Sequence, residues 1–303
     1  FYYRHKHDLN ICPKCFQKQG VSSDEKNFSS FFNSLNIKIK TSDRTILDGK
    51  EIDVLLPDHN MGFEYDGVYW HSEYYLDSNY HINKTNIAKS KNIELYHVFS
   101  DEWTFKSDII KSIIKQKCGT IDNKIFARKC VIKEIDSKTT TKFLNTNHIQ
   151  GSTGSKIRIG LFYNDELVSI MTFSKGRIAL RGKKEDYELV RFCSKLNTSV
   201  VGGATKLLNY FKEKYNPNRI ISYSDVRLFD GKLYEKMGFK KTKENKPNYW
   251  YIINGKRYHR FGFRKSILIK EGFDKNLTEH QIMLNRNIFR VYDCGTVRWE
   301  LNF

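Results

Sequence analysis

Residues 51–73 read EIDVLLPDHNMGFEYDGVYWHSE, and this stretch decides the fold of the region around it. Residues 51–56 alternate in polarity and end at a Pro-Asp turn signal, which predicts a strand. Residues 61–65 predict the next strand, which Asp66-Gly67 closes. Asp53 and Glu64 are eleven residues apart across the turn. A hairpin with this spacing can bring both carboxylates to one face of the sheet.

The two carboxylates suggest a site for a hard cation. Adjacent carboxylates repel each other unless a proton or a cation neutralises them. Oxygen ligands suit Mg²⁺, which activates water and stabilises charge on a phosphodiester. We therefore predict that Asp53 and Glu64 bind Mg²⁺, with Glu25 on the preceding helix as a third oxygen donor. A bland surface pair of acids is the alternative.

The elements around this hairpin predict an α/β (α+β) fold. An apolar face over residues 22–35 predicts a helix, with Ser22 as its N-cap. Residues 84–91 and 105–116 also predict helices, and 94–99 predict a strand. The order helix, strands, helix, strand, helix is typical of a mixed sheet flanked by helices.

The same region resembles the very-short-patch-repair group of PD-(D/E)XK nucleases, and the phage homing endonucleases of that group in particular. The resemblance rests on Glu25, Asp53, Glu64, the run Gly67-Val68-Tyr69-Trp70-His71 and the segments 80–85 and 95–103. It covers residues 20–117 and implies a restriction-endonuclease-like fold and Mg²⁺-dependent DNA cleavage.

One position departs from the nuclease pattern. Asp66 stands where the wider superfamily often has Lys, so either Lys84 or His71 is expected to stabilise charge or handle the proton. The candidate catalytic residues are therefore Glu25, Asp53, Glu64, His71 and Lys84. His97, which alternates with Tyr96 on a strand, is expected to be a packed or hydrogen-bonded histidine.

The second half of the chain contains a glycine turn. Gly202-Gly203-Ala204 follows a strand and opens a helix, and glycines there let backbone N–H groups face an anion. Together with the segment around Tyr234, this region resembles the GNAT acyltransferases over about residues 125–265. The resemblance implies an acetyl-CoA site at Gly202, Gly203, Ala204 and Tyr234. A fold reused for DNA docking remains the alternative.

The charge of the chain favours a polyanionic partner. Its 52 Lys and Arg against 34 Asp and Glu give a net charge of +18, and residues 118–303 carry that whole excess. Such a field attracts phosphate polyanions, which predicts binding of double-stranded DNA. The expected contacts are Trp70, Lys240, Lys241, Lys243, Arg257 and Arg260. A merely soluble basic protein, with a solvated loop at residues 240–246, is the alternative.

The cysteines indicate zinc rather than a disulfide scaffold. Cys12-Pro13-Lys14-Cys15 is a CxxC pair typical of half a zinc ribbon, with an unmetallated turn as the alternative. The other cysteines are widely spaced, so an intracellular, reducing setting is expected. Either His5 and His7 complete the site, or the other ligand pair lies upstream of Phe1, where the sequence opens. No long apolar run or secretory signal is present, and we expect no membrane association.

These features predict four segments: a zinc-ribbon-like piece at 1–20, a nuclease domain at 21–117, a GNAT-like domain at 118–265 and a C-terminal DNA-contact element at 266–303. The favoured function is a Mg²⁺-dependent DNA endonuclease of phage homing type, working in the cytoplasm of an infected bacterium. A GNAT-type acyltransferase acting on DNA bases or protein is the enzymatic alternative. A non-catalytic DNA-binding protein is the third. The oligomeric state cannot be predicted from the sequence.

Overall fold

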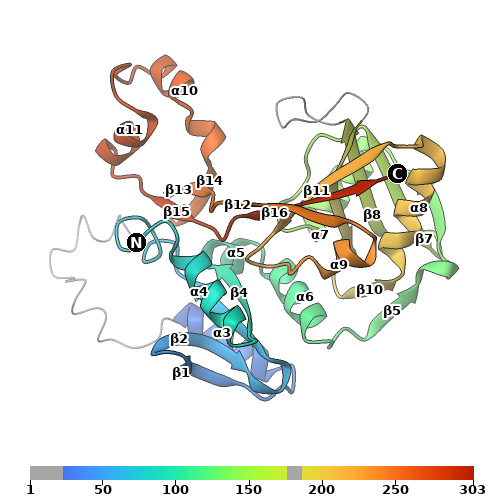
Figure 1. Ribbon diagram of the computed structural model, residues 1–303, viewed down its shortest axis with the longest axis horizontal. Helices are drawn as coiled ribbons and strands as arrows, with labels where there is room; N and C mark the ends of the chain where they lie inside the picture. Colours follow the sequence, from blue (N-terminus) through green and yellow to red (C-terminus); the bar gives the residue numbers. More distant parts are fainter. Residues whose placement is uncertain (1–22, 176–185) are drawn as a thin grey trace. The chain divides into compact units, whose positions relative to one another are not determined.

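A computed structural model describes residues 23–175 and 186–303, and within it the chain forms two compact units (Figure 1). Among the described residues, the first unit combines the chain up to Phe105 with Lys246–Gly295, and the second combines Lys106–Asn245 with Thr296–Phe303. This division differs from the predicted segments, which placed boundaries at 118 and 266. The reason is that residues 246–295 pack with the first unit and the last strand returns to the second.

The first unit contains the expected mixed sheet. Its strands are β1 (Lys40–Leu47), β2 (Lys50–Leu56), β3 (Met61–Asp66) and β4 (Glu94–Phe99), in the order β1-β2-β3-β4. The first three are antiparallel neighbours, and β4 runs parallel to β3. The helices are α3 (Ser23–Asn33), α4 (Tyr80–Ser90) and α5 (Ser100–Phe105), and a 3-10 turn, η1 (Pro57–His59), joins β2 to β3. Helix α4 begins one turn before the predicted residue 84.

Aromatic packing fixes α3 in the first unit. Phe28 and Phe32 are fully buried, and Phe32 packs against Phe63 of β3 with ring centroids 4.9 Å apart. Trp103 of α5 meets Phe28 edge-on at 5.0 Å. This cluster explains the apolar face that predicted the helix. The predicted cap Ser22 lies outside the described residues.

Residues 246–295 add a second small sheet to the first unit, in the order β14-β13-β15. The strands are β13 (Tyr249–Ile253), β14 (Lys256–His259) and β15 (Arg290–Tyr292). Between them lie η4 (Arg260–Phe263), α10 (Lys265–Lys270) and α11 (Glu279–Asn285). Thr278 and Gln281 form the capping box of α11. A bridge from Ser72 to Val291 and a shared core of Val68, Phe99 and Val291 attach this sheet beside β4.

The second unit is a seven-stranded sheet with the order β12-β16-β11-β9-β8-β7-β6. Its strands are β6 (Val131–Glu134), β7 (Ile157–Tyr163), β8 (Glu166–Lys175), β9 (Tyr187–Ser194), β11 (Arg219–Asp225), β12 (Lys240–Asn245) and β16 (Thr296–Asn302). All neighbours are antiparallel except β9 and β11, which pair in parallel at only two positions, Ile220 with Tyr187 and Ile221 with Glu188.

Helices and a short second sheet complete this unit. The helices are α6 (Ser107–Lys117), α7 (Ser137–Asn147), α8 (Gly203–Tyr215) and α9 (Lys232–Lys236), and η2 (Ala127–Lys129) is a 3-10 turn. Strands β5 (Asn123–Phe126) and β10 (Thr198–Val201) pair in parallel. Leu207, Leu208 and Phe211 of α8 are buried in the core, where Phe211 stacks on Phe173 of β8 at 3.6 Å.

Helix α6 confirms the helix predicted at 105–116, and α5, which ends at Phe105, is a separate helix in the other unit. Residues 240–245 form strand β12, so the alternative of a solvated loop at 240–246 does not describe them. The strands on either side of Asp293-Cys294-Gly295 do not pair with each other: β15 pairs with β13, whereas β16 lies between β12 and β11 (Figure 1, red). Gly295 has φ 78°, a left-handed turn that separates them.

Candidate functional site

Polar side chains gather where β3, β4 and α4 meet in the first unit. Glu64 and Asp66 are two residues apart on β3, and the parallel register places Glu64 beside His97 of β4. His81 and Lys84 are three residues apart on α4, so they share one helix face, and both are buried. Charged groups this deep in a protein need partners or a metal ion.

Lys84 and Glu64 form a buried ion pair. The Lys84 ammonium donates to Glu64 Oε2, and the two side chains are only 5% and 2% exposed. Burial raises the pKa of Glu64, although the Lys84 charge opposes that rise. Burial lowers the pKa of Lys84, but the charge and hydrogen bond of Glu64 outweigh it, so its pKa is raised. Glu64 Oε1 is buried and has no hydrogen-bond partner among the residues described.

Asp53 joins this pair from β2. Its Oδ2 accepts a hydrogen bond of 2.7 Å from the backbone N–H of Tyr65. Burial raises its pKa well above the ordinary value, and the nearby charge of Glu64 raises it further. Asp53 and Glu64 are thus close enough to repel each other electrostatically. A divalent cation would relieve that repulsion, and Glu64 Oε1 is an oxygen with a free lone pair for it.

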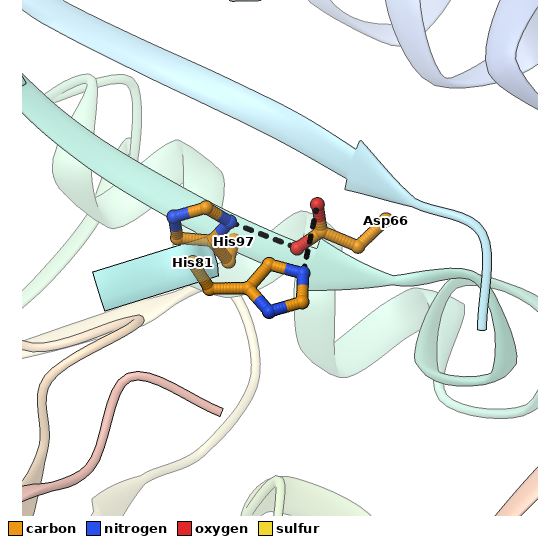
Figure 2. A group of neighbouring side chains, drawn as sticks. All are labelled: Asp66, His81 and His97. Carbon is orange, nitrogen blue, oxygen red and sulfur yellow. Dashed lines mark hydrogen bonds and ion pairs between the residues drawn. The ribbon is translucent and has the colours of Figure 1, made fainter. Parts of the chain in front are cut away.

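A second group surrounds Asp66, and sequence reasoning did not anticipate it as a site. His97 Nδ1 lies 2.9 Å from Asp66 Oδ2. His81 Nε2 and His71 Nδ1 lie 3.7 and 3.2 Å from Asp66 Oδ1. Figure 2 shows the rings of His81 and His97 turned towards the same carboxylate. Asp66, His81 and His97 are all buried, and their ligand atoms lie within 4.8 Å of one another.

The pKa values of this group follow from burial and from charge. Burial lowers the pKa of His81 to about 3 and also lowers that of His71, against the attraction of Asp66. Burial opposes protonation of His97 as well, but Cys294 and Asp66 outweigh it, so the pKa of His97 is raised well above its ordinary value. The three histidines more than offset the effect of burial on Asp66, whose pKa is lowered. His71 and His81 are therefore neutral at neutral pH.

The other predicted nuclease residues lie around this centre. Glu25 is half-buried on α3. The pKa of Tyr65, which follows Glu64 on β3, is raised mainly by burial, then by the charge of Asp24 and then by that of Glu25. Glu25 therefore lies near Tyr65. Trp70 packs with Tyr69 and Tyr75, with ring centroids 5.2 and 5.0 Å away. The predicted zinc pair Cys12 and Cys15 lies outside the described residues.

The predicted DNA contacts fall into two classes. Lys240, Lys241 and Lys243 are exposed on β12, where Lys241 pairs with Glu244. Arg257 does not fit the prediction of a surface contact. Its side chain is 7% exposed and is held by Asp101 at 2.8 Å and Glu102 at 2.7 Å.

The correction for Arg257 has a physical cause: its charge neutralises two largely buried carboxylates, and its guanidinium lies over the Phe99 ring at 4.0 Å. Arg260 is half-buried and lies over the rings of Tyr249 and Phe261, 5.3 and 5.6 Å from their centroids. A run of Arg and aromatic residues in a sequence does not distinguish these structural roles from contacts with DNA.

The glycine turn begins α8 in the second unit. Gly202 caps the helix with φ 77°, and Gly203 is buried so tightly that a Cβ would lie 3.0 Å from Val200 Cγ1. Gly202 lines an open groove of about 880 Å³, together with Phe126, Ala127, Arg128, Ile132, Val201, Thr205, Lys206, Asn209, Tyr210 and Glu213. The Lys206 ammonium donates to the carbonyls of Ala127 and Cys130, at 2.9 and 2.7 Å.

Tyr234 is not among the residues that line this groove. Its hydroxyl lies 2.8 Å from Ser222 Oγ, and its ring stacks on Trp299 at 5.4 Å. Burial raises the pKa of Tyr234. Ala204 is buried at the start of α8. The predicted acetyl-CoA residues thus lie in one unit, but only Gly202 lines the groove.

Comparison with known proteins gives a mixed result. No protein-family model matches the chain, and no curated protein matches it significantly. Among solved structures, an acetyltransferase from Bacillus subtilis in complex with CoA is similar, with 15% identity, 58% of this chain and 99% of that chain covered, and a TM-score of 0.36. The ribosomal-protein-S18-alanine N-acetyltransferase from Escherichia coli is 9% identical, with 57% and 93% covered and a TM-score of 0.36.

A GNAT family acetyltransferase from Elizabethkingia anophelis with acetyl-CoA bound is also similar. It is 11% identical, with 58% of this chain and 99% of that chain covered and a TM-score of 0.34. At these identities and TM-scores the likeness says nothing about the activity of this chain. No helix within residues 23–175 and 186–303 is long and apolar enough to cross a membrane.

Proposed function

We propose that the first unit hydrolyses phosphodiester bonds of double-stranded DNA with Mg²⁺ held by Asp53 and Glu64. The observation that carries this proposal is the buried Glu64–Lys84 pair beside Asp53, with Glu64 Oε1 left without a partner among the residues described. Two carboxylates with raised pKa values and a lone oxygen fit a hard divalent cation. The finer proposal, a phage homing endonuclease, rests on the sequence resemblance alone.

The chain's own residues have distinct roles in this proposal. Mg²⁺, when bound, would act as a Lewis acid towards the phosphate and lower the pKa of a water molecule. The charge of Lys84 opposes the burial that raises the pKa of Glu64, and Lys84 would offset negative charge near the scissile phosphate. His71 is neutral because its pKa is lowered, and its side chain is 20% exposed, so it can accept a proton. Glu25 on α3 would be a supporting oxygen donor.

Nicking of a supercoiled plasmid tests this function. The wild-type protein should nick or linearise the plasmid with Mg²⁺ and not with EDTA. Asp53→Asn should lose about 100-fold or more of the rate while DNA binding persists. Asp58→Asn is the matched control, because Asp58 is an exposed aspartate on η1 in the same unit. Equal nicking by Asp53→Asn and wild type would remove the proposal, and so would nicking that persists in EDTA.

Acyl transfer from acetyl-CoA is the second candidate, and the groove at the start of α8 favours it. The N-terminus of a thirteen-residue helix at Gly202–Gly203 attracts anions such as a pyrophosphate, and Arg128 also lines this groove. The acceptor would be a DNA base or a protein amine. Tyr234 contacts Ser222 and Trp299 and does not line the groove, so the contacts give no support to a role for Tyr234 as proton donor in acyl transfer.

Calorimetric titration with acetyl-CoA tests the second candidate. Gly203→Glu would place a bulky anion beside Val200, so binding should be lost. Gly154→Glu is the control, because Gly154 is exposed and a Cβ there meets nothing within 4 Å. Absence of binding to the wild-type protein would exclude acyl-CoA as a ligand. If acetyl-CoA does not bind and the plasmid also stays intact, a DNA-binding protein without catalysis is the remaining candidate.

A further inference from the structure

The cluster around Asp66 has the composition of a transition-metal centre. We propose that Asp66, His81 and His97, with His71 as the fourth donor, bind one Zn²⁺ ion. This site shares no ligand with the Asp53–Glu64 site, and its ligands are mainly imidazole nitrogens. His71 cannot accept a proton while it binds the ion, so its role as proton acceptor belongs to the zinc-free protein only. The proposal does not depend on DNA cleavage, since metal binding itself can be measured.

Donor spacing is the first argument. The four donor atoms come from β3, β4, α4 and the segment after β3. His71 Nδ1 lies 2.9 Å from His81 Nε2 and 3.2 Å from Asp66 Oδ1, His81 Nε2 lies 3.7 Å from Asp66 Oδ1, and His97 Nδ1 lies 2.9 Å from Asp66 Oδ2. Tetrahedral Zn²⁺ with bonds of about 2.0–2.1 Å holds its ligand atoms about 3.3 Å apart. Three of these distances involve Asp66 Oδ1 or join His71 to His81, whereas His97 faces Oδ2, and the ligand atoms of Asp66, His81 and His97 all lie within 4.8 Å of one another. Binding of one ion would therefore draw the His97 ring and the carboxylate of Asp66 closer to the other two rings.

The donor set also selects the metal. Three imidazoles and one carboxylate suit a borderline ion such as Zn²⁺, whereas Mg²⁺ prefers oxygen ligands and keeps its water. Asp66 is 1% exposed, and its Oδ1 is buried without a hydrogen bond from any described residue, although two ring nitrogens face it. A buried carboxylate oxygen in this position has lone pairs for a metal.

Neighbouring groups orient the ligands, as the outer partners of zinc sites commonly do. His97 presents Nδ1 to Asp66 and has its other nitrogen, Nε2, 3.0 Å from Thr85 Oγ1. Thr85 in turn donates to the carbonyl of His81 at 2.9 Å and lies 3.6 Å from the thiol of Cys294. One hydroxyl therefore connects two of the proposed ligands. The partly exposed ring of His71 marks the edge through which an ion could enter.

A hydrogen-bonded histidine network without metal is the competing account. In that case a proton must lie between His71 Nδ1 and His81 Nε2, which are 2.9 Å apart. Figure 2 shows that Asp66 and the rings of His81 and His97 converge, an arrangement common to both accounts. Direct measurement of metal binding separates them.

The experiment uses the full chain carrying Cys12→Ser and Cys15→Ser, so that the CxxC pair cannot supply the signal. After removal of metal with a chelator, calorimetric titration with Zn²⁺ should give one equivalent per chain. Co²⁺ should give the visible absorption bands of a tetrahedral site without thiolate charge transfer. Mg²⁺ should not compete at millimolar concentration. Absence of Zn²⁺ binding in this background would overturn the proposal without any change to the cluster.

Substitutions in the same background assign the ligands. His81→Gln and His71→Gln should each lower the affinity for Zn²⁺ by about 10–100-fold or more. Loss of a residue that only hydrogen-bonds to a ligand already has an effect of this size. His59→Gln is the control, because His59 is exposed on η1. Circular dichroism checks that each variant is folded. Unchanged affinity in both cluster variants would overturn the proposal, and so would loss of Zn²⁺ binding in Asp53→Asn, which should leave this site intact.

Discussion

Replacement of Lys84 by methionine tests the electrostatic core of the first unit. Methionine keeps the unbranched apolar stem of lysine but leaves Glu64 as an uncompensated charge, 2% exposed and beside Asp53. Breaking a buried ion pair by removing one partner costs about 3–5 kcal/mol. We therefore expect Lys84→Met, without metal, to reduce the free energy of unfolding by that amount at pH 7.

The size of the loss should depend on pH in a defined direction. Burial already raises the pKa of Glu64, and removal of Lys84 would raise it further. Above that folded-state pKa the deficit is fully present. It disappears as the pH falls towards 4.5, the ordinary value of a glutamate, because the folded protein then binds the proton that neutralises the charge. The difference between variant and wild type should thus be smaller at pH 5 than at pH 7.

Urea unfolding followed by tryptophan fluorescence measures this effect. Of the four tryptophans, Trp70, Trp103 and Trp250 lie in the first unit. Lys89→Met is the matched control, because Lys89 is exposed on the same helix. The double variant Lys84→Met with Glu64→Gln should recover most of the loss. A Lys84→Met loss no larger than that of Lys89→Met, or one that is the same at both pH values, would refute the reasoning.

Three further predictions concern single side chains. Asp53→Asn should raise the melting temperature at pH 7 in EDTA relative to Asp58→Asn, because burial and Glu64 raise the pKa of Asp53 and its ionised form destabilises the fold. The gain in melting temperature should vanish as the pH falls towards 3.8, the ordinary pKa of an aspartate. A lower melting temperature at pH 7 would contradict this prediction. Arg257→Met should destabilise the first unit by about 3–5 kcal/mol in urea unfolding and leave DNA affinity unchanged, because Arg257 is paired with two carboxylates. Lys243→Met should lower the salt dependence of DNA binding by about one ion without loss of stability, because Lys243 is exposed on β12. The reverse pattern would mean that Arg257 contacts DNA. Gly231→Ala should lower the free energy of unfolding by about 2–4 kcal/mol in thermal unfolding, because its Cβ would lie 2.1 Å from Trp299 at φ 84°. Gly119→Ala should lower it clearly less, because Gly119 has φ 72° but open space around it. Equal losses would mean that backbone strain alone accounts for the effect of both substitutions.

Local patterns predicted many of the elements well. Strand β4 has the predicted bounds, and β2 and β3 each extend one residue beyond theirs, because each is a short alternating or apolar run with turn residues at its ends. Strand β1 was missed, since Lys40–Leu47 is largely polar and exposed at the edge of its sheet. The partner of β16 could not be predicted, because antiparallel pairing with β11 depends on residues some eighty positions away.

The candidate site shows the same limit. The carboxylates Asp53 and Glu64 were predicted from their spacing and Lys84 from the resemblance to the nuclease group, and the structure pairs Lys84 with Glu64. The histidine cluster was not found, because His71, His81 and His97 come from three segments whose meeting depends on how α4 packs on β3 and β4. The available signals were the two-residue spacing of Glu64 and Asp66 and the three-residue spacing of His81 and Lys84. Arg257 was misassigned because its partners, Asp101 and Glu102, are more than 150 residues away.

The chain passes between its two units at residues 105–106, 245–246 and 295–296, and β16, which follows the last passage, lies in the interior of the seven-stranded sheet. The second unit can therefore complete this sheet only after residues 246–295, which pack in the first unit, have been made. Until then the edges of β11 and β12 that β16 covers are unpaired. Deletion of residues 296–302 would remove an interior strand from one unit while leaving every residue of the other in place.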